Sequence, residues 1–513
     1  MASALTSPYQ DDTIREVVPK VAKLAGKLAQ SSVITDRRRV RIVPQSGQSY
    51  TLGSGGTGTV NFLIQDGAAY ADLQSACLSF TVSITSTANN SAILDDGAWS
   101  IFRRCLVSVN STQADDIDRV AVKANQEIYS TVSQSWYDGP GSVMGLWKHS
   151  ANGVYTGATG TNPTTVANCD VVASKYDVIA KALQEPSVAT GANTSTMRYS
   201  FPVSLLSNFF RQEQLYPCRN AGQLYLQLQL ASANEATIQF VSATGIPVAA
   251  ASAVAVSDMT LELDYVSLHP AYLEMMDRMM NDPEEAGINW AFDAHTVASA
   301  TLSAAGGDQS AVYTKASQNL RSIHIVAQPQ AALGSAGLAF GKQSTFCNPA
   351  VNSVQYRAGS LYFPAFQSIG AARLAMDLFG SYGSTDAVDK ASIVDLTNYN
   401  QLTHSATAAA PVVDVINQAT PPAAVAPVGG IGPRANADCW SHGYCFDRLK
   451  RAKLEGEDLD GINTLSSSGS QIVAQVNTGP PGSGVINEAM TLTGILRYTR
   501  VLRLHGGATQ ILG

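Results

Sequence analysis

Short runs in which apolar and polar side chains alternate recur along most of this sequence, and they constrain its fold more than any other feature. In Leu224–Leu230 a leucine occupies every second position. The same period of two places Leu496, Tyr498 and Leu502 on one face of the segment Gly494–Leu504. Alternation of this kind is typical of a strand with one buried face. Because such runs follow one another from about residue 40, separated by Gly, Ser, Asn and Asp clusters, the sequence predicts an all-β sandwich or barrel.

Helical patterns are few and short, and they fall between the expected strands. We expect helices at Asp118–Tyr129, Ser204–Arg211, Pro270–Asn281 and Ala371–Phe379. The third of these runs into Asn281–Glu285, a sequence typical of a linker. A chain of 513 residues is long enough for two domains that each bury a core without disulfides. We therefore place the domain boundary near residues 270–285.

The charge content narrows the classes of function. Charged residues make up 14% of the chain, against about 25% in a typical soluble protein, and the net charge is −7. A dedicated nucleic-acid-binding protein would carry a strongly basic face, which this balance disfavours. So few charges favour a surface that is partly hidden in repeated contacts between subunits.

Three further features indicate a protein made in the cytosol. The seven cysteines are odd in number and widely scattered, as expected of free thiols in a reducing compartment. The N-terminus is polar and acidic, with no apolar stretch typical of a signal peptide. No run of 18 apolar residues occurs, so no membrane-spanning helix is expected.

The N-terminal segment carries the densest basic sequence. Residues 12–30 have a helical pattern, and a cluster of arginines follows it. The basic residues in question are Lys20, Lys23, Lys27, Arg37, Arg38, Arg39 and Arg41. Two interpretations remain open: a solvated charged arm, or an internal arm that contacts membrane, genome or a minor structural protein.

Two glycine-rich segments resemble nucleotide-binding motifs without meeting their requirements. Gly53–Gly58 has the dinucleotide-binding spacing, but the next residues, Thr59–Ile64, have the pattern of a strand where that motif requires a helix. We therefore expect a hairpin loop there. Gly337–Gln343 is one residue short of a phosphate-binding loop and lacks the Ser or Thr that would hold magnesium. We predict no nucleotide cofactor.

Candidate metal ligands are sparse. Cys439, His442 and Cys445 form the only cluster of soft ligands, and no second Cys/His pair stands nearby to complete a zinc site. The acidic residues within 455–460 lack the rhythm of a calcium loop. No nucleophile elbow and no metalloprotease motif occurs, although carboxylate pairs could still meet in space. The sequence predicts no metal site, no catalytic residues and no enzyme.

Several segments, taken in order, resemble the double jelly-roll major capsid proteins of adenovirus-related tailless double-stranded DNA viruses, in particular the polinton-like and virophage-like groups. They span roughly residues 40–510, and their order carries the resemblance. The segments are Trp99–Asn110 with Asp115–Asp118 after it, Phe201–Phe210 with Leu224–Leu230, Tyr356–Pro364, and Gly461–Thr464 with the closing strand Leu496–Leu504.

This resemblance implies an organisation and a function. The fold would be two consecutive eight-stranded jelly-roll barrels with short helices in the connections: an N-terminal internal arm at 1–45, a first jelly roll at 46–275 and a second at 285–513. The chain would form a homotrimer, a pseudo-hexameric capsomer that tiles an icosahedral virion shell. Penton and minor capsid or cement proteins would be further partners. The protein would be made in the host cytoplasm, or assembled in a viral factory or the nucleus, and would reside in the virion.

Long loops would lie on the outer surface of such a shell. The segments Gly157–Thr165 and Ser405–Pro433 have compositions that predict loops, and the second has no counterpart in the resemblance. Aromatic residues in loop-like segments could anchor subunit contacts or fill a local core. These residues are Trp136, Tyr137, Trp147 and Trp440.

Two other functions remain open. A carbohydrate- or receptor-binding β-sandwich, lectin-like or part of a viral spike, would need an exposed aromatic platform. An enzyme built on two cupin-type barrels would need a bound transition metal, and the paired histidines that usually hold one are absent from the sequence.

Overall fold

A computed structural model describes most of the chain. The described ranges are 34–146, 193–241, 253–281, 288–329, 343–346, 351–382, 440–447, 461–465, 471–478, 489–505 and 508–512. Within these ranges the structure does not describe residues 54–57, 68, 87–89, 96, 213, 304–305 and 345. The expected loops at 157–165 and 405–433, the lysines of the N-terminal segment and the acidic residues at 455–460 lie outside the described residues.

The first half of the chain forms two main antiparallel sheets. Its strands are β1 (Ile34–Ile42), β2 (Tyr50–Leu52), β3 (Thr59–Ile64), β4 (Tyr70–Ser86), β5 (Asn90–Leu94), β6 (Phe102–Val109), β7 (Thr112–Asp118), β8 (Asn193–Pro202), β9 (Leu224–Leu230), β10 (Thr237–Val241) and β11 (Ala253–Leu268). One sheet has the order β1-β11-β4-β8, with β2 also on β11, and the other has the order β3-β9-β6-β7. Strands β5 and β10 pair with each other.

The second half repeats this arrangement. Its strands are β12 (Ile288–Leu302), β13 (Gly307–Thr314), β14 (Leu320–Pro329), β15 (Val351–Ala358), β16 (Leu361–Ile369), β17 (His442–Cys445), β18 (Gln471–Thr478), β19 (Met490–His505) and β20 (Ala508–Leu512). The sheets have the orders β12-β19-β14-β17 and β13-β18-β15-β16, with β20 on β19. Counting the eight main strands of each half in chain order, both halves pair first-eighth-third-sixth in one sheet and second-seventh-fourth-fifth in the other.

Helices are short and lie in the connections between strands. They are η2 (Ala98–Ile101), α2 (Val120–Thr131), α3 (Gln134–Asp138), α4 (Pro140–Val143), η4 (Val203–Leu205), η5 (Asn208–Arg211), α6 (Cys218–Ala221), α7 (Ala233–Ala236), α8 (Pro270–Asn281) and α10 (Ala371–Gly380). None of the helices in the described ranges is long and apolar enough to cross a membrane.

Alternating side chains build the core as the sequence predicts. In β9 the four leucines are at most 1% exposed, whereas the residues between them are half-buried. Burying each leucine contributes roughly 2 kcal/mol relative to leaving it in water. In β19, Leu496, Tyr498, Leu502 and Leu504 are all buried, which confirms the predicted inward face.

Several local expectations need correction. The segment 204–211 forms two short 3-10 helices, η4 and η5, in place of one α-helix. Asp115–Asp118 forms the end of strand β7, and the helix expected from Asp118 begins at Val120. The glycine-rich segment at 53–58 follows β2 and precedes β3, but these strands pair with β11 and β9 respectively. It therefore connects two sheets and does not close a hairpin.

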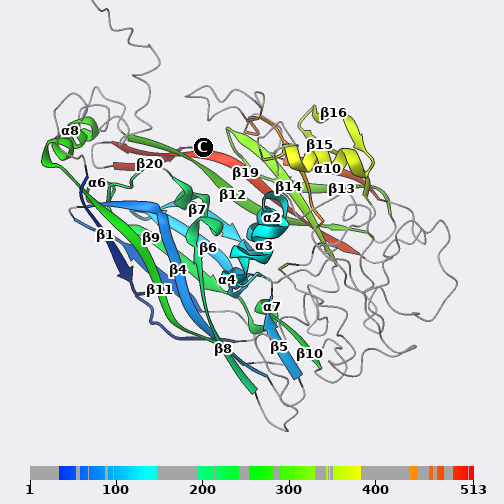
Figure 1. The fold of residues 1–513 in the computed structure, drawn as a ribbon. Helices are drawn as coiled ribbons and strands as arrows, with labels where there is room; N and C mark the ends of the chain where they lie inside the picture. The colour runs from blue at the N-terminus through cyan, green and yellow to red at the C-terminus, as the bar shows by residue number, and fades with distance from the viewer. Residues whose placement is uncertain are drawn as a thin grey trace, which may run out of the picture.

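The two halves lie side by side (Figure 1). Strands up to β11 pair among themselves within the described residues, and so do strands from β12 onward, with α8 between the two sets. In Figure 1, α2 lies where the first half faces β12 and β14 of the second.

Candidate functional site: the seam between the two halves

The predicted basic cluster belongs to the first sheet. Arg37, Arg38, Arg39 and Arg41 lie on β1, which pairs along its length with β11. These arginines, which fall within the arm expected at 1–45, thus lie on a strand that is paired in the first sheet. The reason is that their cross-strand neighbours include carboxylates, which a sequence pattern on β1 alone does not reveal.

Each of the four arginines has a carboxylate partner in the same chain. The Asp264 carboxylate pairs with two of them: Arg37 Nη2 lies 2.7 Å from Oδ2, and Arg39 Nε lies 2.8 Å from Oδ1. Arg38 pairs with Asp66, and Arg41 pairs with Glu262 at 2.8 Å. The hydrogen bond from Arg39 holds the pKa of the Asp264 carboxyl below its usual range.

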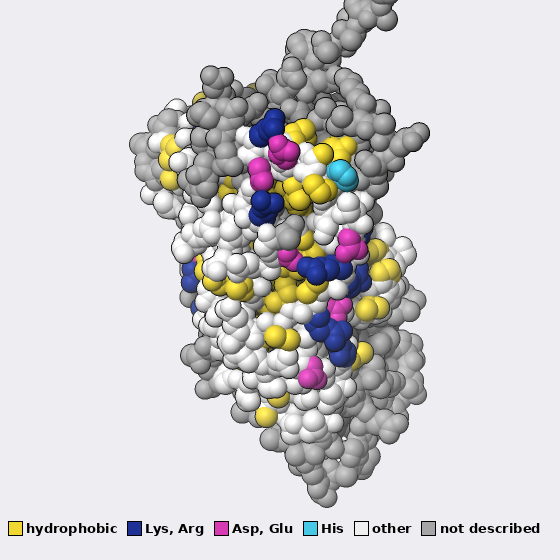
Figure 2. All heavy atoms as spheres, turned by 90° about the vertical axis from the view of Figure 1, so that its left-hand side faces the viewer, with side chains coloured by type: hydrophobic (Ala, Val, Ile, Leu, Met, Phe, Trp, Pro, Cys, Tyr) yellow, Lys and Arg dark blue, Asp and Glu magenta, His cyan; other side chains and the backbone are white. Residues whose placement is uncertain are grey.

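The face of the molecule that includes β1 is consequently mixed in charge. Figure 2 shows basic and acidic side chains interspersed on it, with apolar side chains between them. A surface of this kind lacks the uniform positive field that attracts nucleic acid or anionic lipid.

The two halves meet at a buried polar interface, here called the seam. There β7, α2 and η5 of the first half contact β12, β14, β19 and the residues Gln343, Ser344 and Phe346 of the second. Arg119, which precedes α2, has a left-handed backbone with φ of 52°. From this position it reaches the second half, donating to Thr493 at 2.9 Å and to Gln328 at 2.8 Å. The side chain of this one residue thus joins the start of α2 to strands β19 and β14 of the other barrel.

A second group of hydrogen bonds crosses the seam, and one of its members lies farther along α2. Asp95 is fully buried and accepts hydrogen bonds from the backbone N–H of Gln343, at 2.8 Å, and from the Ser344 hydroxyl. Asn125 on α2 donates to the Gln343 carbonyl at 3.0 Å and accepts from Trp99 at 2.8 Å. Gln343, which the sequence places at the end of a failed phosphate-loop motif, therefore serves to join the two halves.

Aromatic pairs add apolar contact across the seam. The rings of Phe209 and Phe292 lie 5.1 Å apart, nearly perpendicular, and Tyr129 contacts Phe346 at 5.7 Å. Edge-to-face pairs of this type contribute about 1 kcal/mol each beyond the area that they bury. Together, the polar and aromatic contacts hold the two barrels as one block.

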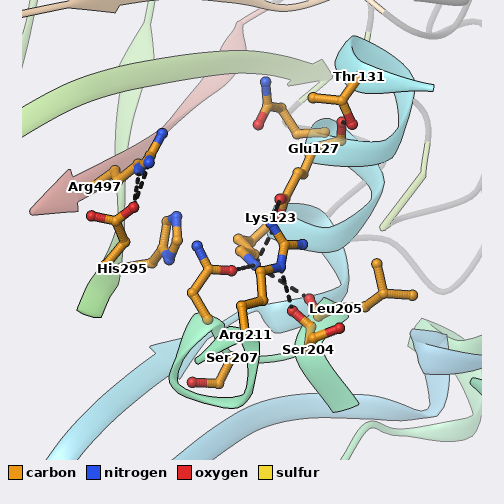
Figure 3. Close-up of polar contacts among 12 residues, drawn as sticks. Lys123, Glu127, Thr131, Ser204, Leu205, Ser207, Arg211, His295 and Arg497 are labelled. Carbon is orange, nitrogen blue, oxygen red and sulfur yellow. Dashed lines mark hydrogen bonds and ion pairs between the residues drawn. The ribbon is translucent and has the colours of Figure 1, made fainter. Parts of the chain in front are cut away.

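A cluster of charged side chains lies in the seam (Figure 3). On α2, Lys123 is 1% exposed and pairs with Glu127 at 2.9 Å, and Arg211 from η5 also reaches Glu127. Burial by itself would raise the pKa of Glu127, but Arg211 and Lys123 hold it below its usual range. Removing one partner of an ion pair this well buried strongly destabilises the folded protein, because the remaining charge is left buried without a counter-charge.

The second half contributes the other side of the cluster. Asp293 on β12 accepts from Arg497 on β19 at 2.8 Å and from Arg321 on β14 at 3.2 Å. Arg321 also donates to Asp447 at 3.0 Å. Burial would raise the pKa of Asp293, yet the two arginines hold it below its usual range.

Two titratable groups stand between these ion pairs. Asp115 on β7 is fully buried, and burial raises the pKa of its carboxyl to about 6, against the hydrogen bond from Ser207. It also accepts from the backbone N–H of His295 on β12 at 3.4 Å. Burial, together with the nearby Lys123, lowers the pKa of His295 well below its usual range, so its ring is neutral at pH 7.

The seam encloses a cleft of about 550 Å³. Glu127, Trp136 and Arg211 line it from the first half, and Asp293, His295 and Arg497 line it from the second. The side chain of Arg211 is 40% exposed, so the cleft opens to solvent on its side.

The predicted aromatic anchors are mostly core residues. Tyr137 and Trp440 are fully buried, and Trp136 packs against the core and lines the cleft. Trp147 lies outside the described residues. Tyr137 and Trp440 thus fill the local core, whereas Trp136 on α3 borders the cleft.

The candidate zinc ligands also occupy buried positions. His442 and Cys445 both lie on β17, which pairs with β14, and Cys439 is outside the described residues. The His442 ring lies 5.8 Å from that of Tyr356, and burial lowers its pKa to about 3. Within the described ranges, no group of three His, Cys, Asp or Glu side chains is placed to hold a metal ion.

Exposed apolar side chains gather on β16, which pairs only with β15 among the described strands. Phe366 is 87% exposed, Ile369 is 68% exposed and Leu361 is 62% exposed. Met376 on α10 adds a further exposed apolar side chain. A strand of this kind at the edge of a sheet is typical of a surface that contacts another chain.

Comparison with solved structures identifies the architecture. The Faustovirus major capsid protein superposes with a TM-score of 0.52 at 9% sequence identity, covering 96% of this chain and 98% of that chain. The fold is a double jelly roll. A chain of the Sputnik virophage structure gives a TM-score of 0.49 at 12% identity, covering 94% of this chain and 89% of its own. The mavirus major capsid protein gives a TM-score of 0.48 at 10% identity, covering 94% of this chain and 91% of its own. No family model and no curated protein sequence matches the chain.

The double jelly roll confirms the fold class predicted from the sequence, two consecutive eight-stranded barrels with short helices in the connections. The first-eighth-third-sixth and second-seventh-fourth-fifth sheets of each half are the two Greek-key sheets of one jelly roll. The two barrels are joined by the seam, whose charged residues sequence reasoning missed. A usable signal was present, since Asp293 and His295 alternate with apolar residues in β12, as Arg497 and Thr499 do in β19.

Proposed function

We propose that this chain is a major capsid protein, which trimerises into pseudo-hexameric capsomers that tile an icosahedral virion shell around the genome. The observation that carries the proposal is the repetition of one eight-stranded jelly roll in a single chain, in a fold shared with the Faustovirus major capsid protein. Three such chains would present six similar barrels around one axis, which suits sixfold packing in a shell.

The seam supports this proposal because a capsomer needs a rigid building block. If the two barrels moved independently, the six sides of a trimer would not keep a fixed shape. The buried hydrogen bonds of Arg119 and Asp95, with the aromatic pairs Phe209–Phe292 and Tyr129–Phe346, tie the two barrels at several separate points.

We propose that the exposed apolar strip of β16, with Met376, contacts a second copy of the chain. Its side chains are too exposed to stabilise the monomer, and they lie on an edge strand that the described residues leave unpaired on one side. A second copy is the occupant that the capsomer requires. The low charge content of the chain, 14%, favours such contacts.

The remaining partners follow from the same proposal. Penton and minor capsid or cement proteins would complete the shell, and the protein would reside in the virion without enzymatic activity. The residues before Ile34, with Lys20, Lys23 and Lys27, would form the internal arm that meets membrane, genome or a minor protein. The arginines of β1 are weaker candidates for that contact, since their carboxylate partners already neutralise them.

Light scattering coupled to gel filtration, followed by negative-stain imaging of the full chain, tests this function. We expect three times the chain mass of 54.0 kDa and a pseudo-hexagonal outline, or spontaneous shells. A monomer that stays monodisperse at high concentration would contradict the trimer. Specific binding on a glycan array by such a monomer would favour the lectin-like alternative, with Tyr362 and Phe366 as its exposed aromatic side chains.

A further inference from the structure

The cleft of the seam contains polar groups that the protein itself leaves unpaired. His295 is 5% exposed and Thr499 is 2% exposed, and both line the cleft. Neither the His295 Nδ1 nor the Thr499 Oγ1 has a hydrogen-bond partner within the described residues. Buried polar atoms normally find partners, because an unpaired one costs about 1–3 kcal/mol.

Strand geometry brings these two groups together with an arginine. Asp293 lies directly opposite Thr499, and His295 lies directly opposite Arg497, in the antiparallel pair β12–β19. Because side chains two residues apart share a face, all four project to the same side of the sheet, toward α2 of the first barrel. Figure 3 shows His295 and Arg497 on the side of the cluster opposite Lys123 and Glu127.

Two guanidinium groups have donors left over. Arg497 uses Nε and Nη2 on Asp293, and Arg211 uses Nη1 on Glu127 and Nε on the Ser204 carbonyl. Within the described part of the chain, the Nη1 of Arg497 and the Nη2 of Arg211 make no hydrogen bond. These donors come from both barrels and border the same cleft.

The charge around the cleft is positive. Arg211, Arg321 and Arg497 line it, against the carboxylates of Glu127 and Asp293. Lys123 and Asp447, which pair with Glu127 and Arg321 respectively, balance each other, and the charge of Asp115 is offset by the nearby Arg500. An anion would therefore gain from the unbalanced positive charge and from donors that are already oriented.

The rest of the lining combines a few polar side chains, among them Thr131, Asn208 and Gln212, with a patch of apolar and aromatic ones. Ile128, Val132 and Trp136 border the cleft from the first barrel, with Leu205 and Phe292 nearby. A volume of about 550 Å³ falls within the range of small-molecule sites and far exceeds that of a single oxyanion. An occupant would thus combine an anionic head with an apolar or aromatic body.

We propose that the seam cleft binds a small organic phosphate monoester. Its phosphate group accepts hydrogen bonds from Arg211, Arg497, Thr499 and the His295 ring, and its body packs against Trp136 and the neighbouring aliphatic side chains. Because the ligand contacts both barrels, its binding stabilises the block that they form.

Isothermal titration of the full chain with phenyl phosphate tests the proposal, with inorganic phosphate and phenol as the two parts of the probe. We expect one saturable site per chain for phenyl phosphate, weaker binding of inorganic phosphate and no binding of phenol. Binding of phenol or inorganic phosphate as tight as that of phenyl phosphate, or no saturable binding at all, would overturn the proposal.

Two variants and a matched control place the site. Arg211→Gln should weaken phenyl phosphate binding at least tenfold, and Thr499→Val by about threefold, as expected for a charged and a neutral donor. Thr499→Val preserves the shape of the side chain, so its affinity for phenyl phosphate can be measured even if Arg211→Gln fails to fold. The control is Thr260→Val, since Thr260 on β11 is a buried threonine whose hydroxyl is also unpaired but which lies outside the cleft. Equal affinities in the wild type, Thr499→Val and Thr260→Val would refute the assignment.

Discussion

Replacing Asp293 by Asn gives the sharpest test of the ion pairs in the seam. The substitution preserves size but removes the charge that Arg497 and Arg321 share. Arg321 keeps Asp447 at 3.0 Å, whereas Arg497 has no other carboxylate partner among the described residues. Breaking a buried ion pair costs about 3–5 kcal/mol, and the lower end applies here because the Asp293 side chain is 17% exposed and Arg321 retains a partner.

This cost translates into a measurable loss of thermal stability. For a block of 513 residues the unfolding entropy is roughly 1.1 kcal/mol per kelvin, so a loss of about 3 kcal/mol lowers Tm by about 3 °C. Differential scanning calorimetry of the full chain at one fixed concentration measures the shift. The matched control is Asp308→Asn on β13, where the exposed carboxylate bonds only to Asn477 within the described residues and the expected effect is within about 0.5 kcal/mol.

The pH dependence of the shift provides a second check. The pKa of Asp293 is held below its unfolded value, so its contribution is complete above about pH 4 and is lost only as the pH falls further. The difference between Asp293→Asn and the wild type should therefore stay constant between pH 5 and pH 7. A shift no larger than that of the control would refute the assignment of Asp293 as the shared partner of the two arginines.

Three further predictions follow from individual contacts. Asp115→Asn should gain about 2 kcal/mol of unfolding free energy relative to the wild type as the pH rises from 4.5 to 7.5, because the buried Asp115 carboxyl, with a pKa raised to about 6, destabilises the wild type as it ionises. Tm measured across pH checks this, and a pH-independent difference would contradict it. Gly222→Ala should lower Tm by several degrees, since Gly222 has a φ of +79° and a Cβ there would lie 2.1 Å from the Asn110 Oδ1; an unchanged Tm would contradict that geometry. Phe366→Ser should weaken the proposed trimers at least tenfold in sedimentation analysis, while Val143→Ser, at an exposed site on α4, leaves them intact. Equal trimer stability in both variants would remove β16 from the proposed interface.

Much of the fold was predictable because strand formation with one buried face leaves a local pattern. Alternation in β9 and β19 gave both the strands and their inward faces, and the helix α8 begins and ends at the residues predicted for it. The resemblance carried by the order of the segments implied two jelly rolls, and the sheet topology bears this out. The strands and helices themselves depend on neighbours in the sequence, so the sequence by itself determined them.

The tertiary structure alone decided what the charged residues do. From the sequence, the arginines of β1 are predicted to belong to a basic arm. Only the register with β11 shows that Asp264 and Glu262 lie beside them. Likewise, Glu127 and Asp293 lie 166 positions apart, and only the packing of one barrel on the other brings them to the same cleft. Charge pairing depends on distances of a few ångströms between segments remote in the chain, and no periodicity within one segment encodes those distances.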